Sequence, residues 1–229
     1  MEFGAIPSRS SELRELDEHR APFLEAILAR DSARARRCVE DALAAGVPVP
    51  DIYLGILEPA LREVGHRWAT GQINVAEEHY ATTIAHSILD ALSRQLPRSP
   101  RDGRLAVVTG TPEEQHVLGA RMVADFLEAD GWEVLLLGAG APAADLVALV
   151  GDEQPDIVAV STATPGVLDG VAELLGALAR LEPRPLIVAG GQLWTATTSP
   201  TALELGADLV LHDPRELVAL LHERIPPPR

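Results

Sequence analysis

A histidine preceded by two glutamates and followed by a glycine is the grouping of side chains in the sequence best suited to metal chemistry. In the segment TPEEQHVLGA, Glu114, His116 and Gly119 form the pattern E-x-H-x-x-G. The imidazole of His116 could donate one ring nitrogen to a metal, while the carboxylate of Glu114 accepts the other N–H and fixes the tautomer. Gly119 would let a bulky ligand approach the backbone closely. The pattern is compatible with a histidine-ligated metal, but taken alone a loop histidine beside two glutamates is more often a solvated or helix-capping residue.

Small and polar residues follow two apolar runs further along the chain. Ser161 and Thr162 come after one run, and Gly190 and Gly191 end the next. Such residues can line a narrow ligand site, although a Gly-Gly pair is also common as a simple turn at the end of a strand. Like the histidine segment, these four residues lie at or just after the end of an apolar run.

The elements that must position these residues are short apolar runs alternating with helical patterns over residues 104–229. The runs are LAVVTG, WEVLLLG, DIVAVST, PLIVAGG and DLVLHD. Strands that are apolar on both faces are typical of a parallel sheet covered by helices on both sides. We predict a flavodoxin- or Rossmann-like, doubly wound, five-stranded parallel sheet. Ligands of such sheets bind beyond the carboxyl ends of the strands, which is where the residues above fall.

Residues 21–96 have the periodicity of helices instead. Apolar residues recur three and four positions apart in four segments: PFLEAILARD, SARARRCVEDALAAG, DIYLGILEPALREVGHRWATG and NVAEEHYATTIAHSILDALSRQL. Gly71 is a plausible end for the third helix, and Asn74 with Glu77 forms a capping pair for the fourth. We predict a four-helix bundle, preceded by an N-terminal extension (1–20) and joined by a Pro-rich linker (97–103) to the sheet domain.

Composition narrows the classes of function. The 229 residues carry a formal charge of −15, and all 19 basic residues are arginine. A negative mean field opposes binding to a phosphate backbone, and the absence of lysine excludes Schiff-base and Walker-type lysine chemistry. The chain has no apolar run of membrane-spanning length and no signal-peptide pattern. We therefore expect a cytoplasmic protein that binds neither nucleic acid directly nor a membrane.

Taken together, the motifs of the second half resemble those of the B12-binding domain family, whose usual signature is D-x-H-x-x-G, then S-x-T or S-x-L, then G-G. The resemblance implies cobalamin as the cofactor, with His116 replacing its dimethylbenzimidazole as the lower cobalt ligand. It also implies that the nucleotide tail lies beside Ser161, Thr162, Gly190 and Gly191. Glu114 stands where Asp is usual, which lengthens the side chain by one methylene. The Glu form resembles the CarH-type photoreceptor branch.

The helical half resembles the cap of the same photoreceptors in the stretch HRWATGQINVAEEHYA. By that resemblance Trp68, Glu78 and His79 enclose the adenosyl group of adenosylcobalamin; each could instead be a bundle-core or solvated helix residue. The photoreceptor pattern has a histidine directly after the tryptophan, as the upper cobalt ligand in the light state, and this chain has Ala69 there. The other candidates for that ligand are His79, His66 and His86.

The resemblance implies a stand-alone, non-enzymatic light sensor that photolyses adenosylcobalamin. The DNA-binding domain of many such photoreceptors is absent from this sequence, so we expect signalling through an unidentified protein partner or a homo-oligomer. The related photocobilins combine the same modules with a bilin, which makes biliverdin a second candidate cofactor. The alternative function is a corrinoid methyl-carrier protein of a methyltransferase system. A phosphate-binding receiver-like regulator is disfavoured, because Thr-Gly-Thr-Pro replaces the acidic cluster expected after the first strand.

Overall fold

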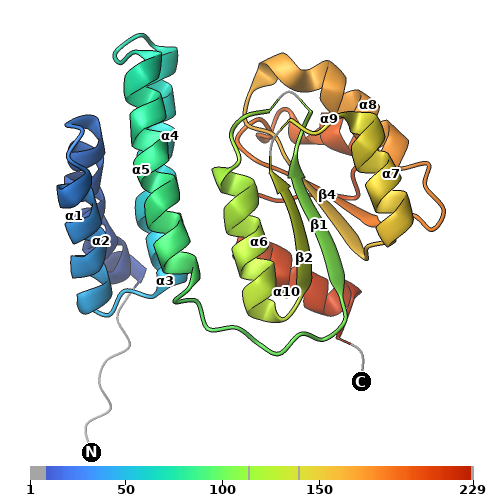
Figure 1. Ribbon diagram of the computed structural model, residues 1–229, viewed down its shortest axis with the longest axis horizontal. Helices are drawn as coiled ribbons and strands as arrows, with labels where there is room; N and C mark the ends of the chain where they lie inside the picture. Colours follow the sequence, from blue (N-terminus) through green and yellow to red (C-terminus); the bar gives the residue numbers. More distant parts are fainter. Residues whose placement is uncertain (1–8, 113, 139, 228–229) are drawn as a thin grey trace, which may run out of the picture. The chain divides into compact units, whose positions relative to one another are not determined.

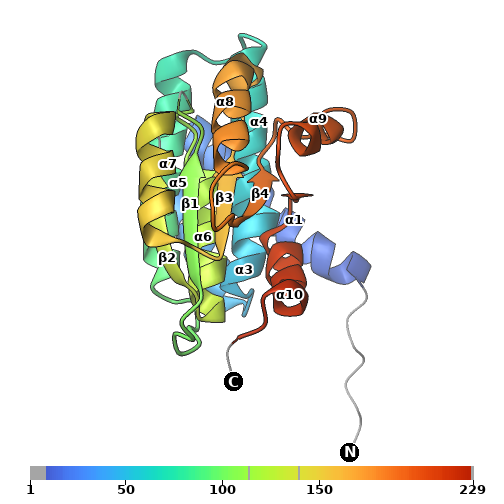
Figure 2. The ribbon, with the colours of Figure 1, turned by 90° about the vertical axis from the view of Figure 1, so that its right-hand side faces the viewer.

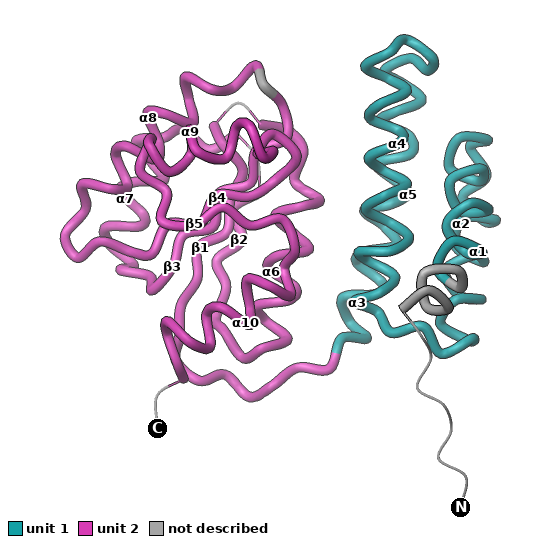
Figure 3. Tube along the Cα trace, turned by 180° about the vertical axis from the view of Figure 1, so that it is seen from behind, with its two compact units in different colours: residues 1–96 teal, residues 97–229 magenta. Residues whose placement is uncertain are grey.

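The structure is a computed structural model that describes residues 9–112, 114–138 and 140–227. Its chain separates into two compact units, Met1–Leu96 and Pro97–Arg229 (Figure 3). The first unit is helical and the second is built on a β-sheet. Each unit has its own buried apolar residues, so each is described by itself.

The four predicted helices of the first unit are confirmed. They are α1 (Arg9–Leu28), α2 (Ser32–Ala44), a continuous helical segment made of α3 (Val49–Ile52), the π-helical turn η1 (Tyr53–Leu57) and α4 (Glu58–Ala69), and α5 (Val75–Ser93). The segment predicted as an N-terminal extension, residues 1–20, is helical from Arg9 onward. Its sequence there, RSSELRELDEHR, is rich in Leu, Arg and Glu, which favour helix; residues 1–8 lie outside the described part of the chain.

The hairpin of α4 and α5 has well-defined ends. Gly71 follows α4 with a φ of +72°, a conformation that glycine adopts without strain. Asn74 caps α5 by accepting hydrogen bonds from the backbone N–H groups of Ala76 and Glu77, and the Glu77 carboxylate accepts from the backbone N–H of Asn74. This is the capping box that the sequence predicts. The two helices therefore pack as an antiparallel pair with a short connection (Figure 1).

The second unit is a five-stranded parallel sheet, as predicted. The strands are β1 (Leu105–Gly110), β2 (Glu133–Gly138), β3 (Ile157–Ser161), β4 (Leu186–Gly190) and β5 (Leu209–Val210). They are connected by α6 (Leu118–Asp130), α7 (Ala143–Glu153), the 3₁₀ turn η2 (Pro165–Val167) with α8 (Leu168–Leu178), and α9 (Ser199–Glu204), and α10 (Pro214–Arg224) follows β5. The strand order β2-β1-β3-β4-β5 is the flavodoxin-like order.

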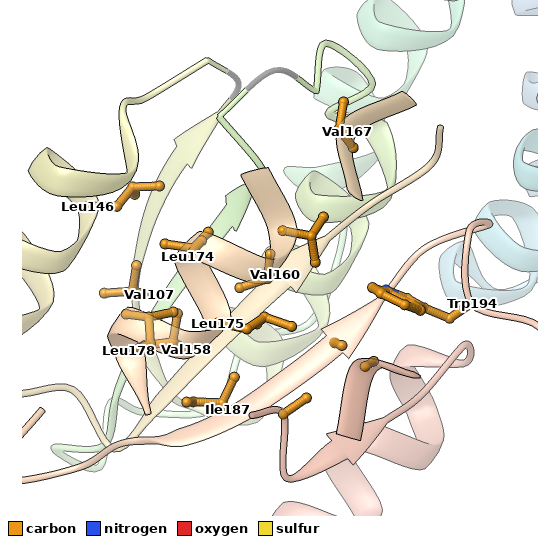
Figure 4. Close-up of a cluster of buried hydrophobic side chains, with 14 of the residues drawn as sticks. Val107, Leu146, Val158, Val160, Val167, Leu174, Leu175, Leu178, Ile187 and Trp194 are labelled. Atoms are coloured by element: carbon orange, nitrogen blue, oxygen red, sulfur yellow. The ribbon is translucent and has the colours of Figure 1, made fainter. Parts of the chain in front are cut away.

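Helices cover both faces of this sheet, which explains why its strands lack the polar alternation of a half-exposed sheet. Along β3, Ile157 and Ala159 pack with residues of α6 and α10, while Val158 and Val160 pack with residues of α7 and α8. Figures 1 and 2 show the two layers, and Figure 4 shows the core on the α7 and α8 side, which includes Trp194.

The predicted linker, residues 97–103, belongs to the second unit and is hydrogen-bonded to the end of α6. The backbone N–H groups of Ser99 and Asp102 donate to the carbonyls of Ala129 and Gly131 at the end of α6. Beyond it, the buried Arg104 forms ion pairs with Asp102 and Asp130. The linker therefore continues into an ordered edge of the sheet unit.

None of the helices among the described residues combines the length and the apolar character needed to cross a membrane.

Candidate functional site

The histidine segment lies where the winding of the sheet reverses. His116 belongs to the connection between β1, which ends at Gly110, and α6, which begins at Leu118. In the sheet, β1 lies between β2 and β3. Helix α6, which connects β1 to β2, covers one face of the sheet, and helix α7, which connects β2 to β3, covers the other face. This is the position at which doubly wound sheets bind ligands, and the prediction that His116 follows the first strand is confirmed.

Glu114 is the buried centre of the segment. One carboxylate oxygen, Oε1, accepts hydrogen bonds from the backbone N–H groups of Gln115 and His116, both at 3.0 Å, and lies 2.5 Å from Nδ1 of His116. The other oxygen, Oε2, accepts from the backbone N–H groups of Ala163 at 2.7 Å and Thr164 at 3.0 Å. The Thr164 hydroxyl donates to Oε2 as well, at 3.3 Å. One side chain thus connects the loop after β1 with the loop after β3.

The charge of Glu114 follows from these donors. Burial disfavours the carboxylate and by itself raises the pKa. The hydrogen bonds from the His116 side chain and from the backbone of His116, Ala163 and Thr164 outweigh burial and lower the pKa of Glu114 to about 2. Glu114 is therefore an anion at neutral pH, although only 1% of its side chain is exposed.

His116 contacts Glu114 through one ring nitrogen and is partly exposed to solvent. Its side chain is 43% exposed, and the carboxylate contact engages Nδ1. The ring nitrogen placed to bind a metal is therefore Nε2, and the carboxylate increases its basicity. No group of three or more His, Cys, Asp or Glu side chains in the described residues could hold a metal ion. One imidazole is enough for a metal that a cofactor ring already holds.

The small residues of the predicted site lie at the adjoining ends of β3, β4 and α6. A Cβ atom on Gly119 would lie 3.4 Å from the Ser161 hydroxyl, so these two residues face each other. Ser161 pairs with Gly110 of β1 and with Gly190 of β4 in the sheet register. Gly119, Ser161 and Gly190 therefore lie together beside the histidine segment.

Gly191 and Thr162 form a tight backbone contact. Gly191 has a φ of +101°, and a Cβ atom there would lie 2.2 Å from the carbonyl oxygen of Thr162. The Thr162 N–H donates to the carbonyl of Gly190, which extends the pairing of β3 with β4 by one residue. The Thr162 side chain is buried, and its hydroxyl has no hydrogen-bond partner among the described residues. Gly191 is needed here for the close approach of two loops.

The sequence did not reveal two contributors to the site. Ala163 and Thr164 hold Glu114 through their backbone N–H groups, and a backbone donor leaves no mark in the residue type. Trp194 is buried in the core on the α7 and α8 side, and its indole N–H has no hydrogen-bond partner among the described residues.

The helical unit contains a second carboxylate–histidine pair. Oε2 of Glu78 lies 2.6 Å from Nδ1 of His79, and Oε1 accepts a hydrogen bond from the Thr82 hydroxyl at 2.7 Å. Trp68 is 42% exposed near the end of α4, at the same end of the α4–α5 hairpin as Glu78 and His79. The three residues predicted for the cap thus share one region of this unit.

The fold and the site together define a class of protein: a doubly wound α/β domain with one carboxylate-oriented histidine at its switch point, suited to a metal macrocycle. The chain belongs to the B12-binding domain family. Residues 104–221 match the family model described as B12 binding domain, and residues 20–93 match a second model of that description. The predicted family and the predicted cofactor class, cobalamin, are thereby confirmed.

Two curated relatives and one solved structure extend this assignment. The HTH-type transcriptional repressor CarH of Myxococcus xanthus is 32% identical over 74% of this chain and 56% of its own length. Monomethylamine corrinoid protein 2 of Methanosarcina acetivorans is 28% identical over 49% of this chain and 54% of its own length. The chain thus spans between half and two thirds of each. The structure of the Methanosarcina barkeri monomethylamine corrinoid protein matches with a TM-score of 0.78 and 21% identity, covering 91% of this chain and 99% of that one, so it shares the fold.

Proposed function

We propose that this protein is a cobalamin-dependent light sensor that takes adenosylcobalamin and has no enzymatic substrate. The observation that carries the proposal is the buried Glu114, which holds His116 by Nδ1 at the switch point of the sheet. The similarity to CarH supports the sensor branch of the family, and so does the grouping of Trp68, Glu78 and His79 at one end of the α4–α5 hairpin.

Each residue of the proposed site would have its own role in binding the cofactor. His116 would hold the cobalt of the cofactor through its imidazole, and Glu114 would orient that ring. Ser161, Thr162, Gly190 and Gly191 would lie beside the nucleotide tail. Gly119 would let the ligand approach the backbone closely. Trp68 offers a flat, exposed indole for shielding the upper face, and Glu78 has spare acceptor capacity on both oxygens for ribose hydroxyls, because a carboxylate oxygen can accept two hydrogen bonds. Bound adenosylcobalamin would supply a light-labile cobalt–carbon bond.

The output would be a change in protein association. A switch needs a bias of only a few kcal/mol between two arrangements, and loss of the adenosyl group on photolysis could provide it. With a net charge of −15, the chain is poorly suited to bind a phosphate backbone itself. We therefore propose that it acts in the cytoplasm through a protein partner or through its own oligomeric state.

The test is reconstitution with adenosylcobalamin in the dark, followed by illumination with green light. We expect the absorption spectrum to change on illumination, together with the oligomer size measured by light scattering. A complex whose spectrum and size are both indifferent to light would refute the sensor function. The His116→Ala variant is the control for specific binding, and it should take up cobalamin at least about tenfold more weakly.

The alternative function is a corrinoid methyl carrier. The sequence similarity to a monomethylamine corrinoid protein favours it, since the same bundle-plus-sheet layout serves both functions. A carrier should prefer methylcobalamin and transfer its methyl group to a thiol acceptor when the cognate methyltransferases are added. Methyl transfer without a light response would replace the sensor proposal with this one.

Biliverdin as a second ligand is also part of the proposal. Cys38, the single cysteine of the chain, is half-buried on α2, and burial raises the pKa of its thiol. A raised pKa reduces the thiolate needed for covalent attachment, so we expect any bilin to bind noncovalently. Adding biliverdin to the cobalamin-loaded protein, followed by gel filtration, tests this: a bilin absorption band should co-elute with the protein, and its absence would exclude the second ligand.

A further inference from the structure

Three buried polar side-chain atoms have no hydrogen-bond partner among the described residues, and all three belong to the sheet unit. They are the hydroxyl oxygens of Thr111 and Thr162 and the indole nitrogen of Trp194. Burying a polar group without a partner costs free energy, so such groups are rare in proteins. A ligand that supplies the missing partner would recover this cost when it binds.

The three residues lie at the carboxyl ends of neighbouring strands. Thr111 and Thr162 directly follow Gly110 and Ser161, which pair in the register of β1 and β3. Trp194 lies in the loop after β4, and Figure 4 shows its ring at the end of that strand. The atoms without partners therefore border the edge of the sheet at which we propose that the cofactor binds.

Thr162 and Trp194 lie on the same side of the sheet. Side chains two positions apart along an extended strand share a face, so Thr162 continues the row of Val158 and Val160. Trp194 belongs to the same apolar core cluster as these two valines. The N–H of Leu193 also donates to the carbonyl of Thr162 at 3.1 Å. The indole N–H of Trp194 is thus buried in apolar surroundings next to the end of β3.

The chemistry of the indole defines the missing partner. An indole N–H can only donate, so its partner must be an acceptor. The nucleotide tail of cobalamin offers two kinds of acceptor, a phosphate and the ring nitrogen of its benzimidazole base. An anion is costly to bury among apolar side chains, and a neutral ring nitrogen costs far less. The apolar surroundings of Trp194 therefore favour the base.

The base nitrogen has a matching need for a donor. In free cobalamin this nitrogen binds the cobalt, and it loses that partner when a protein histidine holds the cobalt instead. A buried acceptor without a donor is then left on the cofactor, and a buried donor without an acceptor is present on the protein. Each supplies what the other lacks.

We propose that Trp194 is a specificity-determining residue for the cofactor, and that its indole N–H donates a hydrogen bond to the ring nitrogen of the tail base. The inference rests on the proposed function, in which His116 holds the cobalt in place of that base. The protein then selects corrinoids whose tail ends in a nitrogen-containing base over corrinoids with a phenolic base or with no tail.

The experiment is a set of equilibrium titrations in the dark with the complete chain, as wild-type protein and as W194F. Three corrinoids are compared: cobalamin; a phenolyl cobamide, which keeps the phosphate and ribose but has no ring nitrogen in its base; and cobinamide, which lacks the nucleotide tail. Phenylalanine keeps an aromatic ring and removes the donor. We expect W194F to bind cobalamin about five- to twentyfold more weakly than wild-type protein, and to bind the other two with unchanged affinity.

Trp132 provides the matched control for the loss of an indole. It is also buried in the sheet unit, but its indole N–H donates to Asp130 at 3.2 Å. W132F loses the same volume and, in addition, a hydrogen bond within the protein. W132F should therefore unfold at a lower denaturant concentration than W194F and should bind cobalamin as wild-type protein does. A W132F protein that loses as much cobalamin affinity as W194F would show that the effect is general destabilisation.

Three further results would overturn the proposal: equal cobalamin affinities of wild-type protein and W194F, equal weakening of W194F toward cobalamin and the phenolyl cobamide, or equal affinity of wild-type protein for these two corrinoids. The second result would assign the donor to the phosphate or ribose. The third needs no variant, so it decides the question even if W194F does not fold.

These outcomes are distinct from failure of the proposed function. If wild-type protein binds none of the three corrinoids, the proposed function and this inference fail together. If wild-type protein binds cobalamin and W194F binds it equally well, only the role of Trp194 is rejected. A cobalamin complex that does not respond to light would reject the sensor function and leave the affinities measured in the dark unchanged.

Discussion

Oε2 of Glu114 accepts a hydrogen bond from the backbone N–H of Ala163 at 2.7 Å, across 49 positions of sequence. The same carboxylate contacts Nδ1 of His116 through its other oxygen. The loop after β3 and the orientation of the histidine ring are therefore coupled through one side chain. A glutamate reaches both partners here, so the extra methylene relative to aspartate is accommodated.

Replacing Glu114 by glutamine should destabilise the protein in a pH-dependent manner. The pKa falls from an ordinary 4.5 to about 2 in the folded protein, which corresponds to roughly 3 kcal/mol of stability. Because the pKa of Glu114 is lower in the folded state than in the unfolded state, its carboxylate stabilises the fold fully above pH ~4.5. This contribution is lost as the pH falls toward 2. Thermal or denaturant unfolding of wild-type protein and E114Q between pH 7 and 3 measures it, and the difference between the two should narrow with acidification.

A surface glutamate of the same unit is the control for this series. Glu128 forms an ion pair with the largely exposed Arg98, and such pairs contribute at most about 1 kcal/mol. E128Q should therefore stay within that range of wild-type stability at pH 7. An E114Q protein as stable as E128Q would show that Glu114 does not hold the two loops together.

Gly119 should be required for cobalamin binding but not for folding. A Cβ atom there meets only the Ser161 hydroxyl, at an ordinary contact distance of 3.4 Å, and Gly119 lies within α6. G119A should therefore unfold within about 1 kcal/mol of wild-type protein. G119L, whose longer side chain occupies the space beside Ser161, should bind cobalamin at least about tenfold more weakly in equilibrium titrations. Equal affinity of G119L and wild-type protein would contradict a role in ligand approach.

Gly191 should be required for the fold. Alanine there would place Cβ 2.2 Å from the Thr162 carbonyl oxygen, at a φ of +101°. We expect G191A to lose at least about 3 kcal/mol of unfolding free energy, because strain at a positive φ adds to a backbone clash. Gly138 provides the matched control, with a φ of +71° and no atom within 4 Å of its Cβ position. G138A should lose only about 1 kcal/mol.

Arg104 should stabilise the sheet unit without affecting the pigment. Its side chain is 3% exposed, forms ion pairs with Asp102 and Asp130, and lies 4.4 Å from the ring centroid of Trp132. Removing one partner of a buried ion pair typically costs 3–5 kcal/mol, so R104A should unfold more easily by about that amount. R101A is the control, since Arg101 is 73% exposed and pairs with Glu133 at the surface. A changed cobalamin spectrum in folded R104A would contradict this purely structural role.

Most of the fold could be predicted from local pattern. Runs such as LAVVTG and DIVAVST are apolar at consecutive positions, and their observed strands, β1 and β3, are covered on both faces. The helix ends at Gly71 and Asn74 could also be predicted from the sequence, because capping depends on residues only a few positions apart. Helix α1 begins earlier than expected, since apolar periodicity does not mark the polar N-terminal turns of a helix.

The sequence by itself determined the family, the sheet and the position of His116 just after the first strand, because each follows from residue types and apolar patterns along the chain. Only the tertiary structure decided what Glu114 does, since its partners Ala163 and Thr164 are distant in sequence and act through backbone N–H groups. It also separated Gly119, where a Cβ atom fits, from Gly191, where a Cβ atom would strike the Thr162 backbone. The physical reason is that packing distances between loops depend on how the strands align, and residue type does not record that alignment.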